Sequence, residues 1–366
     1  MSNRIRWGIL GTGTVARDVA RSFALVPDAE FAAVGSRNLD TAQAFASRFG
    51  IPRAYGSYDE LLADDSIDVV YIATPHDRHR DDCLKCFDAG KAVLCEKPFT
   101  LNAAQALEVV SAAREKRLFC MEAMWMRFIP LVRKVRELVD AGEIGHVQMV
   151  KADFGYPTWY DPENRFFNLA RGGGSLMDRG IYTLSLARFL LGDHENLKSS
   201  ATIGPTGVDH QSACLLEYPN GAIADLSSTL VTWGTNEAVI MGTKGQIRIH
   251  DPFYRPSRVS VKHFDEPCAP VESLGDNSGL KRKLKESALV NRLQRMATPL
   301  LDRLRGARAI SHPFPGSGYQ FEIEEVTQCL QRGDTESSIM PLDDTLAIME
   351  TMDEMRASWG MRYPQE

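Results

Sequence analysis

Residues 11–16 read Gly-Thr-Gly-Thr-Val-Ala, a G-x-G-x-x-A motif between an apolar run at residues 4–10 and a helical pattern that continues to residue 23. In such a motif Gly11 permits a tight turn, Gly13 lets the backbone approach a pyrophosphate, and Ala16 lets the helix pack closely on the strand. The first N–H groups of the helix then attract the phosphates. We therefore expect a dinucleotide to bind at Gly11, Thr12, Gly13, Thr14 and Val15.

The end of the second expected strand, residues 31–35, indicates which dinucleotide this is. NAD enzymes usually carry Asp or Glu here to bond the ribose 2′-hydroxyl, whereas this chain carries Ser36 and Arg37. A guanidinium can hold a 2′-phosphate with two hydrogen bonds and can stack on adenine. Ser36 and Arg37 therefore favour NADP, with NAD as the less favoured cofactor.

Apolar runs and helical patterns alternate over the first third of the chain, which predicts a doubly wound parallel sheet. Polar residues follow two of these runs, at residues 74–79 and at residues 96–97. Ligands of open parallel sheets bind at the carboxyl ends of the strands. We therefore expect cofactor contacts from Thr74, Pro75, His76, His79, Glu96 and Lys97, with Lys97 where cofactor and substrate meet.

From about residue 146 the alternation gives way to several strands with short connections, which predicts a second, α+β domain with an open, mainly antiparallel sheet. We divide the chain into residues 1–124 and residues 125–366. Within the second part Gly172-Gly173-Gly174 opens a helical pattern in which Asp178 and Tyr182 are four residues apart, so both lie on one face. A carboxylate on that face can orient the phenol for proton transfer.

Composition excludes several classes of protein. The 366 residues carry a net charge of -6, which argues against a nucleic-acid or anionic-membrane partner. No apolar run reaches the roughly 18 residues of a membrane-spanning helix, and no secretory segment is recognisable. The seven cysteines are scattered and suit reduced, buried thiols, so we expect a cytoplasmic protein without a metal site. A basic stretch at residues 281–308 is interpreted as a solvated helix or a flexible insertion.

Three motifs occur in order and at suitable separations: residues 11–16, residues 96–98, and Gly172-Gly173-Gly174 with Asp178 and Tyr182. In this the chain resembles the Gfo/Idh/MocA oxidoreductases, which have an N-terminal Rossmann domain and a C-terminal α/β domain with an open sheet. Most of that family carries histidine where this chain has Tyr182. Tyrosine there, together with residues 122–128, resembles the branch of dimeric dihydrodiol dehydrogenases and NADP-dependent D-xylose dehydrogenases.

The resemblance implies an NADP-dependent dehydrogenase that moves a hydride between the nicotinamide and a secondary alcohol or hemiacetal carbon of a sugar, polyol or cyclic trans-diol. Tyr182 would be the general acid/base, with its pKa lowered by Lys97, although Lys97 itself can be the base. Asp178 would hold a substrate hydroxyl or the lysine. The substrate wall would consist of Trp125, Arg127, Phe154 and Arg165.

The resemblance also suggests a homodimer or homotetramer. Two alternatives share the fold: an NADP(H)-binding sensor or regulator without activity, and an NAD-dependent enzyme that cleaves glycosides. The presence of Lys97, Asp178 and Tyr182 argues against the sensor, and Arg37 argues against the NAD enzyme.

Overall fold

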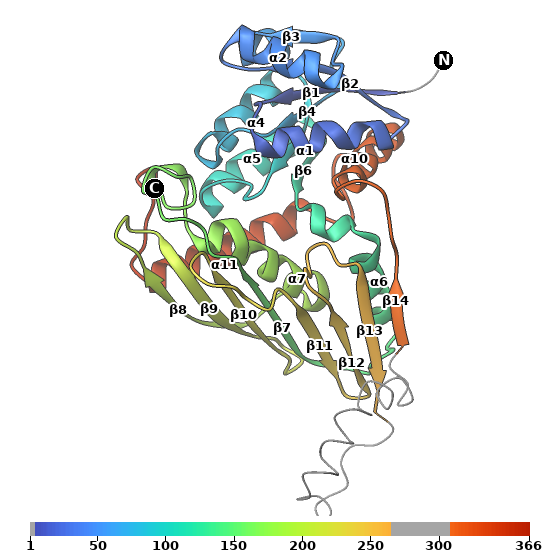
Figure 1. The fold of residues 1–366 in the computed structure, drawn as a ribbon, viewed down its shortest axis with the longest axis vertical. Coiled ribbons are helices and arrows are strands. Elements are labelled where there is room, and N and C mark those ends of the chain that lie inside the picture. Colours follow the sequence, from blue (N-terminus) through green and yellow to red (C-terminus); the bar gives the residue numbers. More distant parts are fainter. Residues whose placement is uncertain (1–3, 265–307) are drawn as a thin grey trace, which may run out of the picture.

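The computed structural model describes residues 4–264 and 308–366, which form two sheets joined by helices (Figure 1). The first sheet is entirely parallel and has the order β3-β2-β1-β4-β5-β6. The strand order reverses between the paired strands β1 and β4, and such sheets bind nucleotides at the carboxyl ends of the strands where the order reverses. The predicted doubly wound sheet is confirmed, although the short β3 was not expected. The strands are β1 (Ile5–Leu10), β2 (Ala29–Gly35), β3 (Arg53–Tyr55), β4 (Val69–Ile72), β5 (Ala92–Glu96) and β6 (Cys120–Ala123).

Helices cover both faces of this first sheet, and for that reason β4 and β5 are buried at every position. Asn38, Ser57 and Asn102 cap three of the helices by accepting a hydrogen bond from a backbone N–H in the first turn. The helices are α1 (Thr14–Ser22), α2 (Leu39–Phe49), α3 (Tyr58–Leu62), α4 (His79–Asp88) and α5 (Ala103–Lys116).

The second sheet has the order β14-β13-β12-β11-β7-β10-β9-β8, and only its β7–β10 pair is parallel. This confirms the predicted α+β part with a mainly antiparallel sheet. The strands are β7 (Val147–Gly155), β8 (Asn196–Ile203), β9 (Asp209–Glu217), β10 (Ile223–Thr229), β11 (Ala238–Gly242), β12 (Gly245–Ile249), β13 (Arg258–His263) and β14 (Arg308–Ser311).

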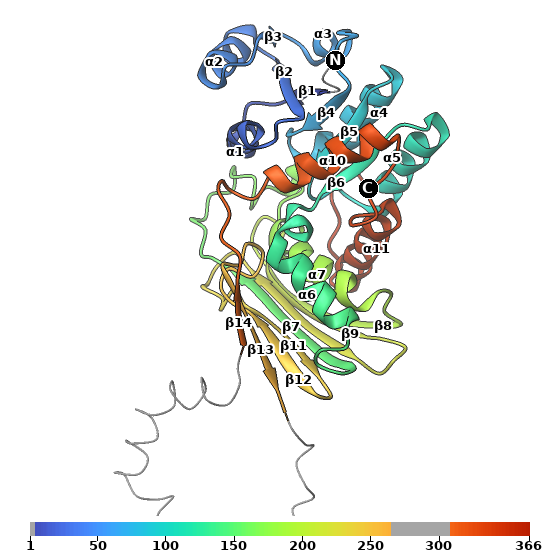
Figure 2. The ribbon, with the colours of Figure 1, turned by 90° about the vertical axis from the view of Figure 1, so that its right-hand side faces the viewer.

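One face of this sheet is covered by α6 (Pro130–Asp140), α7 (Ile181–Leu191) and α11 (Leu342–Ser358), and no described helix lies on the other (Figure 2). Burial along β9 alternates accordingly: Cys214 and Leu216 are buried, while Ala213 and Leu215 are exposed.

The last helices return to the first sheet. Helix α10 (Gln320–Arg332) packs on β1 and β2, and α11 packs on α5. Asp353 of α11 accepts a hydrogen bond from the backbone N–H of Ala103 (2.8 Å), and Arg356 donates to the carbonyl of Leu101 (3.2 Å). The boundary between residues 124 and 125 stays a prediction, since segments from both sides of it complete the first sheet.

Two expectations concern segments rather than the site. Among the described helices, none is both long and apolar enough to cross a membrane. The basic stretch lies outside the described residues except for Arg308, which begins β14.

Candidate active site

The glycine turn between β1 and α1 has the geometry of a phosphate cradle. Gly11 has φ +102°, and a Cβ there would lie 2.7 Å from the carbonyl oxygen of Ala73, so only glycine fits. A Cβ on Gly13 would meet nothing within 4 Å, which leaves open space in front of α1. No acidic residue occupies the first turn of α1 and no side chain caps it, so its first N–H groups are available to an anion.

The carboxyl end of β2 carries the two residues that favour NADP. Ser36 is buried, and its backbone N–H donates to the carbonyl of Tyr55 (3.1 Å). Arg37 is exposed and forms no ion pair with any described residue. A guanidinium is thus presented to solvent where the ribose of a dinucleotide would lie.

His79 links the loops that follow β4 and β5. Its ring is fully buried, with Nδ1 2.9 Å from the carbonyl oxygen of Pro98 and Nε2 2.9 Å from that of Thr74. Both ring nitrogens are therefore occupied by the protein. The prediction that His79 contacts the cofactor is wrong, and the residue instead holds the loop that carries Lys97.

Thr74 and Glu96 are also largely buried, whereas Pro75 is exposed at the same edge. The hydroxyl of Thr74 donates to Asp82 (2.7 Å). The Glu96 carboxyl accepts hydrogen bonds from the hydroxyl of Tyr71 and from the backbone N–H of Lys97. Cofactor contacts of these residues stay a prediction.

His76 extends toward the second part of the chain. Its Nδ1 lies 3.3 Å from the carbonyl oxygen of Gly172, the first of the three glycines. Burial lowers the pKa of His76 to about 3, and the positive charges of nearby Arg165 and Lys97 lower it further in the same direction. The ring is therefore neutral at physiological pH.

Lys97, Asp178 and Tyr182 come together although 81 residues separate the first two in the chain. The Lys97 ammonium donates to the carbonyl oxygen of Asp178 (2.8 Å), lies 3.3 Å from its carboxylate, and sits 4.7 Å from the ring centre of Tyr182. Residues 176–180 form one π-helical turn ahead of α7, instead of the continuous α-helix expected from the sequence. Such turns are frequent at functional sites.

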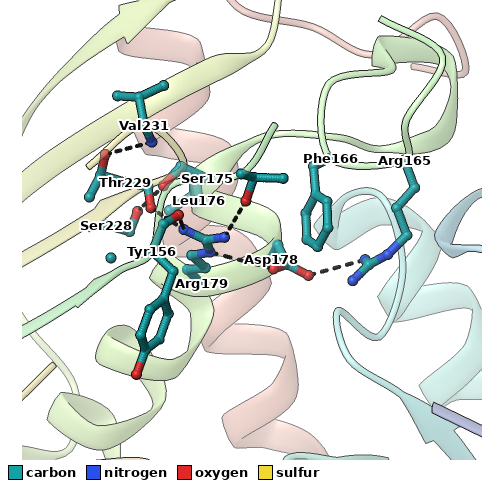
Figure 3. A network of polar contacts seen from close by, with 12 residues as sticks. Tyr156, Arg165, Phe166, Ser175, Leu176, Asp178, Arg179, Ser228, Thr229 and Val231 are labelled. Carbon is teal, nitrogen blue, oxygen red and sulfur yellow. Dashed lines mark hydrogen bonds and ion pairs between the residues drawn. The ribbon is translucent and has the colours of Figure 1, made fainter. Parts of the chain in front are cut away.

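Asp178 lies between two guanidinium groups, those of Arg165 and Arg179 (Figure 3). Burial alone would raise the pKa of Asp178, but Lys97 and Arg165 lower it well below its usual range. Asp178 is therefore a carboxylate that holds the Lys97 ammonium. The structure shows this lysine contact, one of the two alternatives expected for Asp178.

Arg179 was not singled out from the sequence. Its buried guanidinium donates to the carbonyls of Tyr156 and Thr229 and to the hydroxyl of Thr158 (2.7 Å), as Figure 3 shows in part. It thereby ties the end of β7 and the end of β10 to the turn that carries Asp178. Its position directly after Asp178, within the motif already singled out, was the signal for this role.

Tyr182 is buried in an aromatic cluster with Trp125, Phe154 and Tyr254. The indole Nε1 of Trp125 donates to the phenol oxygen of Tyr182 (2.8 Å). Burial raises the pKa of Tyr182 well above its usual value. The expected lowering of this pKa is therefore not seen in this structure, where burial outweighs the Lys97 ammonium that lies over the ring.

The four residues expected at the substrate wall separate into two groups. Trp125 and Phe154 touch Tyr182, and Arg165, whose side chain is 48% exposed, stacks on Phe166 beside Asp178. Arg127 is fully buried, and its guanidinium donates to Ser185 (2.9 Å) and Asp344 (2.5 Å). The prediction that Arg127 contacts the substrate is wrong, because its buried guanidinium is bonded to α7 and α11.

Comparison with known proteins covers nearly the whole chain. Residues 5–124 match the family described as "Oxidoreductase family, NAD-binding Rossmann fold", and residues 132–248 match "GFO/IDH/MocA C-terminal domain". Trans-1,2-dihydrobenzene-1,2-diol dehydrogenase from Mus musculus is 34% identical over 370 residues, and that from Bos taurus is 33% identical over 369; the alignments cover 99% of this chain and of each relative.

Solved structures are similar over the same length. Aldose-aldose oxidoreductase from Caulobacter crescentus has a TM-score of 0.78 at 23% identity and covers 97% of both chains. KijD10, a 3-ketoreductase from Actinomadura kijaniata solved with NADP and TDP-benzene, has a TM-score of 0.75 at 25% identity and covers 97% of this chain and 98% of its own. The fold, the glycine turn at Gly11 and the Lys97–Asp178–Tyr182 cluster thus coincide with full-length sequence similarity, and the protein belongs to the Gfo/Idh/MocA family of oxidoreductases.

Proposed function

We propose that the protein is an NADP-dependent dehydrogenase that acts on a secondary alcohol or hemiacetal carbon of a sugar, polyol or cyclic trans-diol. The convergence of Lys97, Asp178 and Tyr182 at the carboxyl edge of the first sheet carries this proposal. A sensor that only binds NADP(H) does not need an ammonium group, that of Lys97, held by the Asp178 carboxylate against the buried phenol of Tyr182.

The residues present fit a bound dinucleotide. The turn at Gly11 and Gly13 leaves room for the pyrophosphate, and α1 offers its unpaired N–H groups to it. Exposed Arg37 suits the 2′-phosphate that distinguishes NADP. The bound nicotinamide would supply the hydride acceptor or donor. The NADP in the related 3-ketoreductase structure supports the same choice.

The chain itself supplies proton transfer and orientation. Tyr182 takes the hydroxyl proton of the substrate when the alcohol is oxidised and returns it on reduction. Lys97, held by Asp178, places a positive charge beside the reacting oxygen. We expect Trp125 and Phe154, which contact Tyr182, and Arg165, which contacts Asp178, to form the wall against which a cyclic substrate binds. The names of the two dehydrogenase relatives favour a diol, and that of the Caulobacter enzyme favours an aldose.

The first experiment follows the absorbance of reduced nicotinamide with NADP+ and, separately, with NAD+. The substrates are D-xylose, D-glucose, levoglucosan, inositols and a trans-dihydrodiol. We expect turnover with NADP+ that collapses in Lys97→Met and Tyr182→Phe but persists in Lys85→Met, which removes an exposed lysine of α4. Tight NADPH binding without any turnover would instead favour the sensor, and protein purified with tightly bound NAD would favour glycoside cleavage.

A second copy of the chain would cover the open face of the second sheet. Leu215, Val231 and Trp233 are exposed on or beside that face, and apolar side chains gathered on one face suit contact with another protein chain. We expect a homodimer or homotetramer in sedimentation, and a shift toward monomer in Leu215→Lys. Sedimentation of the unmodified protein as a monomer alone would contradict this expectation.

A further inference from the structure

The phenol oxygen of Tyr182 has one protein partner among the described residues, the indole N–H of Trp125 at 2.8 Å. Both side chains are buried, with 6% of Trp125 and 5% of Tyr182 exposed. Trp125 begins the short helix Trp125–Phe128 directly after β6. Its ring packs on Tyr319 (centroids 4.9 Å apart) and on Tyr254 (6.0 Å), so the position of the donor is fixed from two further sides.

The direction of this hydrogen bond follows from the chemistry of indole. An indole N–H can only donate, so it occupies a lone pair of the Tyr182 oxygen. The hydroxyl hydrogen of Tyr182 then points elsewhere, and in the part of the chain that the structure describes it has no acceptor. The hydrogen is thereby left for a bound ligand.

We propose that Trp125 is a positioning residue for proton transfer, whose N–H orients the Tyr182 hydroxyl and stabilises the phenolate that remains when Tyr182 has released its proton. The inference rests on the proposed acid/base role of Tyr182. A hydrogen bond from N–H to a phenolate is charge-assisted and about twice as strong as one to a neutral phenol. Trp125 therefore favours the deprotonated state, in addition to any contact with substrate.

Apart from Lys97, the other groups that face Tyr182 oppose its phenolate state. Lys97 is the cation, 4.7 Å from the ring centre. Burial, the phenol of Tyr319 and the negative charges of Glu96 and Asp178 work against a phenolate. The titratable or charged groups around Tyr182 are Lys97, Glu96, Asp178, Tyr254 and Tyr319. Once the indole N–H is removed, Lys97 is the group among the described residues that still stabilises the phenolate.

The test is the pH dependence of kcat for alcohol oxidation in Trp125→Phe, which keeps an aromatic ring and loses the N–H. We expect the limb that reports deprotonation to move about one pH unit to higher pH, with kcat recovering at alkaline pH. Tyr254→Phe is the matched control, because it removes a hydroxyl from a ring packed on both Trp125 and Tyr182 but no hydrogen bond between them. Its limb should stay in place. A loss of kcat in Trp125→Phe that is equal at every pH would overturn the proposal.

Two further measurements test the same hydrogen bond independently of Trp125→Phe kinetics. Replacement of all tryptophans by fluorotryptophan makes the indole N–H more acidic without changing its shape, so the limb should move to lower pH, and should not do so in the Trp125→Phe background. Trifluorotyrosine placed at position 182 ionises in an accessible pH range and can be followed by fluorine NMR without any turnover. A higher apparent pKa in Trp125→Phe than in the parent supports the proposal, and equal values refute it even if no substrate is ever found.

Discussion

Glu122, at the end of β6, should make the stability of this fold decrease as the pH rises. Its side chain is fully buried beneath the loop that carries Lys97. One carboxyl oxygen accepts the backbone N–H of Phe99 (3.2 Å), and the hydroxyl of Thr345 also lies against the carboxyl. Burial raises the pKa of Glu122 to about 7.

The magnitude follows from linkage between protonation and folding. The pKa of Glu122 rises from 4.5, the value of an exposed glutamate in the unfolded chain, to about 7 in the fold, so the folded state favours the protonated acid. The stabilisation is complete below pH 4.5 and is lost as the pH rises through 7. At about 1.4 kcal/mol per pH unit, Glu122 costs the fold about 3 kcal/mol at alkaline pH relative to acid.

Glu122→Gln keeps an acceptor for the N–H of Phe99 and cannot ionise. We expect urea unfolding of the variant to lack this decrease, so that its free energy of unfolding gains about 3 kcal/mol on the parent between about pH 4 and about pH 8. Exposed Glu115→Gln on α5 is the control and should follow the parent. Parallel curves for the parent and Glu122→Gln would refute the reasoning.

Three further predictions address single side chains. Arg127→Met breaks a buried ion pair with Asp344 and should lower the free energy of unfolding by about 3–5 kcal/mol in urea, while a KM effect without loss of stability would restore its substrate role. Gly11→Ala places a Cβ 2.7 Å from the oxygen of Ala73 and should weaken NADPH binding about tenfold or more in a fluorescence titration; unchanged affinity would show that the turn is not the phosphate site. The fold lowers the pKa of His76 from 6.5 to about 3, so the neutral ring contributes stability above pH 6.5 that is lost as the pH falls toward 3. The melting temperature of His76→Gln should therefore decrease less than that of the parent on acidification. An equal decrease in the two proteins would contradict the assignment.

Local patterns were sufficient to predict the order of strands and helices. The apolar run before Gly11 and the helix after it constrain each other over a few residues, and β4 and β5 are continuous apolar runs because both of their faces are covered. The strand β3 escaped prediction because it has three half-buried residues and little pattern. The return of α10 and α11 to the first sheet depends on distant contacts, such as that of Ala103 with Asp353 250 residues further along the chain, which no periodicity records.

For the site, the sequence indicated which residues matter better than how each is used. The motif containing Asp178 and Tyr182 was visible, but the π-helical turn and the contact with Lys97 depend on tertiary packing. His79 and Arg127 have the chemistry of ligand-binding residues, yet internal partners occupy them. Their burial could not be recognised without the positions of distant carbonyl and carboxylate groups.

The contact of α10 with β1 and β2 has a consequence for folding during synthesis on the ribosome. The dinucleotide-binding strands leave the ribosome long before residues 320–332, which must cover one face of their sheet. Until α10 has been synthesised, the part of that face near Tyr71 lacks the helix that packs on it. The exposed apolar surface of the incomplete first sheet would be a binding site for chaperones during synthesis. A truncated chain that ends before α10 would keep this surface exposed and would be a substrate for degradation.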